Sequence, residues 1–574
     1  MKRNIIINGA LGLLLIGSMA SCASDYLDTE PIASVTNAQV GKSTEDLMKA
    51  VNGIGWFMNY PQIVNGKVEG GGYPCGTTGE PYMMTYFGDC YGQDTYQNHF
   101  AVFQGGDMIR MLYVANNSYY SQAKAWGFYY TLIRQANAIL DMVDGAEESI
   151  EGQRNQIKAQ ALTFRAHAYV RLLQIFGPRW QDSNNGERKC IVLRLHQGTE
   201  ALPLVTMNEV LNQIYADCTE ATTLFADPAT YNERPNWSVP TYEVACGTFA
   251  RAALLKQDWA TAEKWAAEAQ KGHEIMTNAQ WCGGFMEACD DYLWTNSVNQ
   301  DDRLTNISWA AYNACNGNYP NYWQIGSGNI NIDLYEQMDP KDIRRTRFLM
   351  PDQINIDKAQ FYKATVFNPT TMFFEGSNKK NRQILAAITT FMEQATPPTP
   401  SSGLEVATAY TDIGGRGTAP TYVFGAQVKF YAMGGSMQLC QYPFMRATEM
   451  LLTQAEACAM QGKTGDAQAL ISKLTQMRVP GSAAVTLTGD ELIEFIRTQR
   501  RIELWGEGTT FFDLKRWNKH NVRRAWVEND PTSGNCPATY AIDIAPDEVN
   551  HWVFMLPRVE SDYNKAIDVS ELLW

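Results

Sequence analysis

The chain has few histidines, and the motifs of several common enzymes are missing from its 574 residues. Only six histidines occur, and none belongs to an H-E-x-x-H pattern, since His273-Glu274 lacks the second histidine. No G-x-S-x-G sequence is present, which removes support for a hydrolase nucleophile elbow. No two cysteines have C-x-x-C spacing. The sequence therefore gives no support for zinc, thioredoxin-like or serine-hydrolase chemistry.

Positive charge is also scarce. The 47 lysines and arginines are outnumbered by 61 aspartates and glutamates, for a formal net charge of −14. An acidic chain without a basic tail is a poor candidate for binding nucleic acid, so no nucleic-acid partner is expected. Charged residues make up 19% of the chain and hydrophobic residues 45%, which is typical of a folded globular protein.

The main N-terminal apolar run is too short to cross a bilayer, which takes about 20 apolar residues. It extends from Ile5 to Ile16, follows Lys2 and Arg3, and is succeeded by Ala20-Ser21-Cys22. This order is typical of a secretory signal, and the last three residues resemble a bacterial lipobox. We expect residues 1–21 to be a lipoprotein signal peptide and Cys22 to carry the lipid that anchors the protein. An ordinary signal peptide with a chance cysteine is the alternative.

Apolar residues recur at helical spacing through much of the chain. Three early helices are expected at residues 123–143, 153–176 and 207–225, and two helical hairpins at 244–255 with 259–271 and at 448–460 with 465–477. Small residues such as Ala250 and Ala266 occupy the facing positions of the first hairpin, as in tetratricopeptide repeats. The sequence predicts a mostly α fold in which tetratricopeptide-like hairpins form a scaffold.

Residues 280–442 differ in kind from the helical segments. They are rich in Gly, Asn, Trp and Tyr and show few helical periods. So much irregular chain in a compact protein usually has a function. We expect one domain over residues 22–574, with helical hairpins in 22–279, an irregular, loop-rich ligand-binding region in 280–442, and a further hairpin in 443–574.

Eleven cysteines besides Cys22 are present. Three lie within helical patterns and are expected to be small core residues: Cys218, Cys246 and Cys458. Cys75 with Cys90, or Cys282 with Cys289, are candidates for disulfide bonds in an oxidising compartment. The sequence does not determine the connectivity.

The C-terminal third contains the string Arg500-Arg501-Ile502-Glu503-Leu504-Trp505, followed by Phe511-Phe512-Asp513-Leu514-Lys515-Arg516-Trp517. This string resembles the signature of the SusD/RagB family of outer-membrane nutrient-binding lipoproteins. Further similar stretches occur in family order, at Asp25–Asp28, Arg165–Tyr169, Arg446–Glu449 and Leu556–Arg558. The resemblance therefore spans nearly the whole chain.

The resemblance implies a cell-surface lipoprotein, anchored to the outer membrane, that binds an oligosaccharide or polysaccharide. It would deliver this glycan to a partner, a SusC-like TonB-dependent outer-membrane transporter. Binding and hinge motion make or break no bond, so no enzyme activity and no cofactor are expected. A metal site is likewise not expected, although structural calcium stays open.

The charged residues of the signature alternate with apolar ones across a predicted helix and the turn after it. Such residues can form a buried, hydrogen-bonded ion network that fixes a chain reversal. We therefore expect a structural role, not a catalytic one, for this set: Arg500, Arg501, Glu503, Glu507, Asp513 and Arg516.

Aromatic residues in polar loops are suited to glycan binding, because the C–H faces of a pyranose stack on flat rings while amides bind the hydroxyl groups. The best single patch is Asn316–Trp323, where rings alternate with amides. The candidate glycan-binding residues are Trp323, Tyr319, Tyr322, Trp309, Tyr312, Asn318, Trp281, Trp294, Tyr73 and Tyr96. An equally plain interpretation of any one of them is an amphipathic side chain that fills the surface.

Three alternatives remain open. A relative of the same architecture can take peptides instead of glycans. Paired carboxylates at Asp290-Asp291 or Asp301-Asp302 could serve a surface glycoside hydrolase. The third alternative is a structural subunit that has no ligand site of its own.

Overall fold

The computed structural model describes the chain in separate ranges. These are residues 41–59, 63–64, 67–68, 79–96, 109–111, 114–118, 120–234, 236–296, 308–317, 328–356, 379–407, 425–435, 438–527, 530, 532–536, 538–568 and 570.

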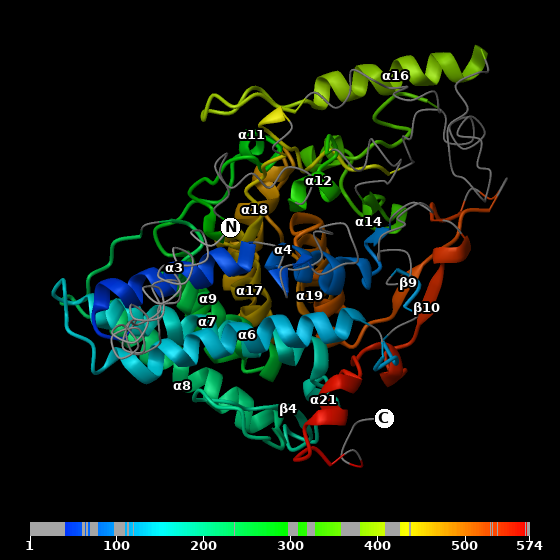
Figure 1. Ribbon diagram of the computed structural model, residues 1–574. Coiled ribbons are helices and arrows are strands. Elements are labelled where there is room, and N and C mark those ends of the chain that lie inside the picture. The colour runs from blue at the N-terminus through cyan, green and yellow to red at the C-terminus, as the bar shows by residue number, and fades with distance from the viewer. Residues whose placement is uncertain are drawn as a thin grey trace, which may run out of the picture.

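A stack of antiparallel helices forms the scaffold (Figure 1). Its N-terminal members are α3 (Thr44–Asn59), α6 (Tyr120–Val143), α7 (Gln153–Phe176), α8 (Met207–Ala226), α9 (Tyr242–Lys256) and α10 (Trp259–Gln270). From α6 to α10 each helix packs against the next one in sequence, as in a repeat of helical hairpins. The three early helices and the first hairpin predicted from periodicity are confirmed, with ends within a few residues.

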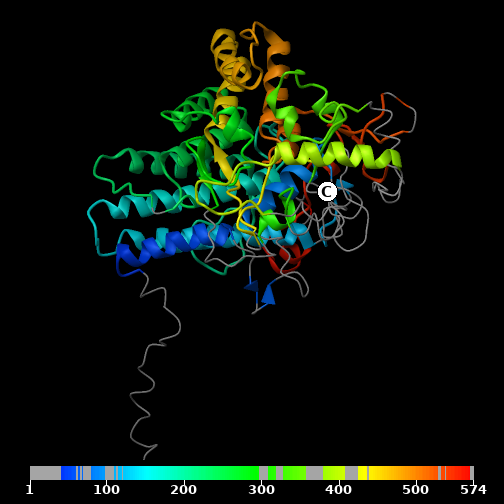
Figure 2. The same ribbon diagram turned by 90° about the horizontal axis from the view of Figure 1, so that it is seen from above.

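The second predicted hairpin continues this stack. It consists of α17 (Ala447–Met460) and α18 (Thr464–Arg478), and α19 (Gly489–Glu503) packs against both. Helix α10 packs directly on α17, so the two hairpins are neighbours although the irregular region separates them in sequence. Figure 2 shows them adjacent. The predicted mostly α fold is therefore confirmed.

Local sequence explains where the helices begin and end. Thr206 and Glu209 form a capping box at the start of α8, with Glu209 N 3.2 Å from Thr206 Oγ1. Asp258 caps α10 by accepting a hydrogen bond from Thr261 N. Gly462 lies in the turn between α17 and α18 with a φ of +73°, which a glycine adopts without steric cost. These signals fix the hairpin turns.

The helices approach each other closely because small residues face the contacts. The alanines at these positions have no measurable exposure: Ala245, Ala250, Ala253, Ala262, Ala266 and Ala269. Cys218, Cys246 and Cys458 are buried between helices, as predicted. Side chains of this size bring the helix backbones together, which is the packing expected of tetratricopeptide-like hairpins.

Short antiparallel strand pairs connect distant parts of the chain. The strands are β1 (Ile63–Val64), β2 (Lys67–Val68), β3 (Thr95–Tyr96), β4 (Lys189–Val192), β5 (Leu204–Thr206), β6 (Tyr292–Thr295), β7 (Asn329–Ile330), β8 (Pro443–Arg446), β9 (Asn521–Arg523) and β10 (Ile542–Ile544). Strand β6 pairs with β8, so the two ends of the irregular region are held side by side. Strand β3 pairs with β7 and thereby links the N-terminal part to this region.

Irregular backbone and short helices make up most of the described part of residues 280–442. The helical pieces at or within this region are α11 (Asn278–Trp281), α12 (Trp309–Asn313), α14 (Ile332–Tyr335), η5 (Ile343–Arg347) and α16 (Lys379–Ala395). Helix α16 was not predicted. Its buried residues Ile388, Phe391, Met392 and Ala395 recur at helical spacing, and this short pattern was the available signal.

The remaining helical segments surround the signature. They are α4 (Glu80–Met83), η1 (Met84–Cys90), η2 (Trp180–Asp182), α20 (Thr510–Trp517), η8 (Ala538–Tyr540), η9 (Val549–His551) and α21 (Arg558–Tyr563). In the described ranges no helix combines the length and apolar character needed to cross a bilayer.

The cysteine arrangement differs from one expectation. Cys282 and Cys289 are both free thiols, so the proposed disulfide between them is not formed. Cys90 is also free and buried, while Cys75 and the predicted lipidation site Cys22 lie outside the described residues. Burial raises the pKa of the Cys289 thiol to about 11, because the surroundings disfavour the thiolate. A neutral thiol of this kind packs as a small apolar side chain.

Candidate ligand-binding region and its supporting network

A buried carboxylate, Glu503, lies at the centre of the ion network predicted from the signature. Arg478 donates to it through Nε and Nη2 at 3.0 and 2.9 Å, and Arg344 donates through Nη1 at 3.1 Å. All three side chains are fully buried. Burial opposes the charge of Glu503, but the nearby arginines outweigh burial and hold the pKa of this carboxyl well below its usual range. Glu503 therefore joins α18, α19 and η5 as a permanent anion.

The network continues through Arg446 and Glu507. Arg446 Nε lies 2.7 Å from Glu507 Oε2, and Lys429 Nζ lies 2.7 Å from Glu507 Oε1. Burial lowers the pKa of Lys429 to about 8, an effect that Glu507 partly offsets. Arg501 forms an ion pair with Asp94 of the N-terminal part. The network thus connects the irregular region and the N-terminal part to the helical stack.

Helix α20 is attached to the stack by the same kind of interaction. Arg500 Nε lies 2.7 Å from Asp513 Oδ2, and Arg516 donates to both Asp513 and Glu456. All six charged residues of the signature are therefore engaged in buried ion pairs or hydrogen bonds. The prediction of a structural role for this set is confirmed.

Asp291, one of the carboxylates considered for glycoside cleavage, belongs to this network. Its carboxylate accepts hydrogen bonds from Arg446 Nη1 at 2.6 Å and from Thr448 N at 2.7 Å, so it caps α17. A carboxylate with these partners and no exposure is occupied structurally. Its neighbour Asp290 is exposed, and Asp301 and Asp302 lie outside the described residues. Within the described ranges no cluster of three His, Cys, Asp or Glu residues is placed to hold a metal ion.

Three of the candidate glycan-binding rings are core residues. Trp281, Trp294 and Tyr96 have no measurable exposure. Trp294 Nε1 donates to Ser238 O at 2.9 Å, and its ring packs edge-on against His167. These rings offer no face to a ligand from solvent in this structure. Sequence composition could not distinguish them from surface rings, because an irregular layer also needs large side chains to fill its core.

Two further candidates, Trp309 and Tyr312, lie on α12 beside the N-terminal helical turns α4 and η1. Trp309 is nearly buried, and its Nε1 donates to Thr85 Oγ1 at 2.8 Å. Tyr312 is half-buried and packs edge-on against Tyr82, with ring centroids 6.3 Å apart. The structure therefore brings the N-terminal and middle parts of the chain together here.

The other five candidates lie outside the described residues and stay predictions. They are Trp323, Tyr319, Tyr322, Asn318 and Tyr73. The start of the same patch is visible at Asn316, which is fully buried and hydrogen bonds to Ala407 O and Ala432 O at 2.8 and 2.9 Å. The Asn316 side-chain amide is therefore already engaged and is not available to a sugar.

A cavity that the sequence analysis missed opens beside α14. Its volume is about 280 Å³, and its lining combines apolar side chains with a polar cluster of Tyr335, Arg345 and Asp352. Tyr335 Oη donates to Asp352 Oδ1 at 2.9 Å, and Arg345 Nη2 donates to Asp352 Oδ2 at 2.8 Å. Burial opposes the charge of Asp352, but hydrogen bonds from Arg345 and Tyr335 prevail and lower its pKa. All the lining residues fall within residues 332–356, but they match no known ligand-binding motif, so the sequence analysis did not identify the cavity.

Comparison with known proteins identifies the family. Residues 290–551 match the model described as "SusD family", and residues 59–254 match the model described as "Starch-binding associating with outer membrane". No curated protein matches the sequence.

Solved structures share the fold. A SusD-like carbohydrate binding protein from Bacteroides vulgatus is 18% identical with a TM-score of 0.65, covering 92% of this chain and 98% of its own. A SusD superfamily protein from Bacteroides thetaiotaomicron is 16% identical with a TM-score of 0.63. The match covers 92% of this chain and 99% of the other chain. Surface glycan-binding protein A from Bacteroides fluxus is 14% identical with a TM-score of 0.52, covering 83% and 89%. Two family models that together span most of the chain, and a fold that agrees with them, show that this protein belongs to the SusD family.

Proposed function

We propose that this protein is a lipid-anchored glycan receptor of the outer membrane, exposed at the cell surface, that passes its cargo to a SusC-like TonB-dependent transporter. The names of the matched family and of the similar structures, which refer to starch, carbohydrate and surface glycan, support glycan as the cargo. No step of this function makes or breaks a covalent bond. The occupied state of Asp291 is consistent with such a role, because this carboxylate is engaged in the scaffold.

The observation that carries the proposal is the junction between α12 and α4. Tyr312 presents a partly exposed ring next to Tyr82, and the buried hydrogen bond from Trp309 to Thr85 fixes α12 in place. Gly317 ends this described stretch, and residues 318–323, which contain the best candidate patch, follow it in sequence. A ring held on a rigid support loses little entropy when it stacks on a sugar.

A binding screen of the chain from Ala23 to Trp574 tests this proposal. Polysaccharides and oligosaccharides of several classes are compared by isothermal titration, with Tyr312→Ala and Trp323→Ala as site variants. Tyr563→Ala is the control, because this tyrosine is 81% exposed and lies on α21, at the far C-terminal end of the fold. Binding of one glycan class that both site variants weaken and the control preserves supports the proposal. Equal binding by all variants would place the site elsewhere.

Peptide cargo is a second candidate, favoured by the cavity beside α14. Its apolar side chains Ile332, Met350 and Ile356 suit an apolar peptide side chain, and the Arg345–Asp352 pair at its edge suits polar backbone groups. A peptide mixture that binds the parent chain but not an Ile356→Asp variant would support this cargo. Ile356 is half-buried, so the added charge lies at the cavity without entering the core.

A further inference from the structure

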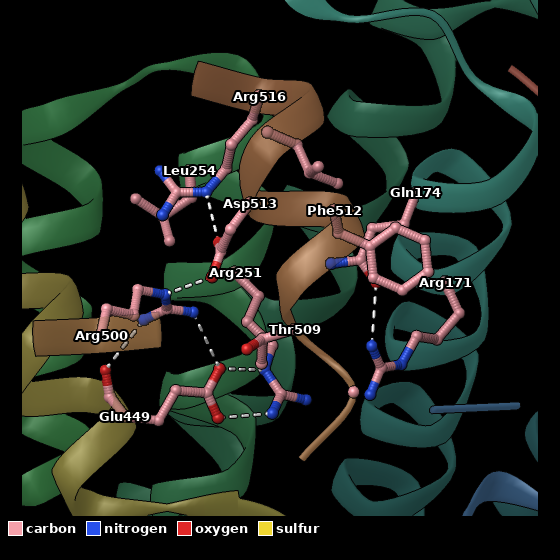
Figure 3. A pocket seen from close by; sticks show the side chains of 12 residues that line it. Arg171, Gln174, Arg251, Leu254, Glu449, Arg500, Thr509, Phe512, Asp513 and Arg516 are labelled. Carbon is pink, nitrogen blue, oxygen red and sulfur yellow. Dashed lines mark hydrogen bonds and ion pairs between the residues drawn. The ribbon is translucent and has the colours of Figure 1, made fainter. Parts of the chain in front are cut away.

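A small cavity lies behind the family signature, between α7, α9, α17 and α20 (Figure 3). Its volume is about 30 Å³. This is room for one or two species of roughly the size of a water molecule. A sugar ring does not fit in this volume, so the cavity is separate from the proposed glycan site.

Two buried guanidinium groups enter this cavity, each with one unused nitrogen. Arg171 uses Nε for Glu80 at 2.8 Å and Nη1 for Gln174 at 3.0 Å. Arg251 uses Nε and Nη2 for Glu449 at 2.8 and 2.6 Å. Arg171 Nη2 and Arg251 Nη1 have no partner in the described part of the chain, although both residues are at least nine-tenths buried. An unpaired buried donor on a charged group is costly, so these two atoms call for an acceptor.

Figure 3 shows both guanidinium groups turned toward the same space, with the chain that leads into α20 passing between them. Gly508 and Thr509 precede the first residue of α20, and no side chain caps this helix. The N-terminus of a helix carries a partial positive charge and free N–H groups. This helix end is therefore a third positive feature in the lining of the cavity, although Gly508 N already donates to Asp89 Oδ2 at 2.8 Å.

The carboxylates in the lining are already neutralised. Both oxygens of Glu449 accept hydrogen bonds from Arg251, and both oxygens of Asp513 accept from arginines, Arg500 and Arg516. Among the groups in the lining that have no partner, only donors are found in the described residues. The cavity therefore offers donors and positive charge to whatever occupies it.

We propose that this cavity binds one small inorganic anion, with chloride as the occupant. Arg171 Nη2, Arg251 Nη1 and the N-terminal end of α20 hold it. The bound ion joins α7, α9 and α20, between which the described residues form no direct ion pair. Its binding adds stability in proportion to the logarithm of the chloride concentration once the site is saturated.

Bromide locates the ion directly. Crystals of the chain from Ala23 to Trp574 are soaked in sodium bromide, and anomalous scattering is recorded at the bromine edge. The expected result is an anomalous peak within hydrogen-bonding distance of both unused arginine nitrogens. Density for water without an anomalous peak would overturn the proposal. This measurement involves no glycan, so it stands or fails independently of the proposed function.

Thermal unfolding tests the energetic part in solution. We expect a higher unfolding midpoint in sodium chloride than in sodium gluconate at the same ionic strength, since gluconate is too large for the cavity. Gln174→Glu places a carboxylate beside Arg171 and should abolish this difference between the salts. Gln476→Glu adds the same charge at an exposed position on α18 and should retain it. A parent chain with the same midpoint in both salts contradicts the proposal.

Discussion

Arg446 and Asp291 form an ion pair without any solvent exposure, with Nη1 2.6 Å from the carboxylate oxygen. The two residues lie at opposite ends of the irregular region, on β8 and immediately before β6. The pair therefore fastens both ends of this region to the first turn of α17.

The first prediction concerns this pair. Asp291→Asn removes the charge that balances Arg446, and loss of one partner of a buried pair costs about 3 kcal/mol or more. We expect the free energy of unfolding, measured with urea, to fall by about that amount. Asp290→Asn is the matched control, because Asp290 is exposed, and it should change stability little. A small effect at Asp291 would show that the pair is not important for folding.

The second prediction concerns acid. Burial opposes the charge of Glu456, but Arg516 prevails and lowers its pKa from 4.5 to about 2. A carboxyl whose pKa is lower in the folded state contributes stability that is lost as the pH falls from about 5 to 2. The urea concentration at the midpoint of unfolding should therefore decrease as the pH falls over this range. Glu456→Gln should be less stable at pH 6, and its difference from the parent should narrow at low pH. Glu491→Gln, at an exposed position on α19, should follow the parent.

The third prediction concerns the close packing of the hairpins. Ala266 has no exposure and lies on α10, a helix in close contact with both α9 and α17. Ala266→Leu adds volume that this contact cannot accept, and overpacking typically costs about 1–3 kcal/mol. A lower unfolding midpoint by calorimetry is expected. Ala260→Leu makes the same substitution at an exposed position on the same helix. It is the control and should change the unfolding midpoint much less.

The fourth prediction concerns the thiols. Cys282 and Cys289 are free and half-buried, so both should react with iodoacetamide in denaturant without prior reduction. Mass spectrometry of the digested protein checks this. A peptide pair linked through these two cysteines would contradict the structure. Reducing agent should leave the unfolding midpoint unchanged if no disulfide stabilises the chain.

The fifth prediction gives a magnitude for the proposed glycan site. Removal of a ring that stacks on a sugar costs about 1 kcal/mol of binding free energy, which corresponds to a roughly fivefold larger dissociation constant. Tyr312→Ala should show this loss, while Tyr312→Phe should keep most of the affinity because the ring remains. Equal losses in both variants would indicate a hydrogen bond from the hydroxyl instead of stacking.

Periodicity and small residues were sufficient to predict most of the helical scaffold, although α3 was not among the predicted helices. Helix α7, for example, begins and ends at the predicted residues, because Gly177-Pro178 is a strong stop signal. The buried ion network was also predictable, because charges alternate with apolar residues in the signature. The candidate glycan-binding rings were harder to sort, since the buried Trp281 and the half-buried Tyr312 both occur beside polar residues in sequence. Only their contacts separate a core ring from a partly exposed neighbour such as Tyr312.

The pairing of β6 with β8 also has an evolutionary consequence. It closes the irregular region at its base, so the chain enters and leaves the scaffold at one point. Insertions and substitutions between these strands can accumulate without changing how the helices stack, provided that Arg344 and Lys429 keep their partners in the network and β7 keeps its pairing with β3. One scaffold can in this way acquire new specificities by replacement of a single contiguous stretch of gene.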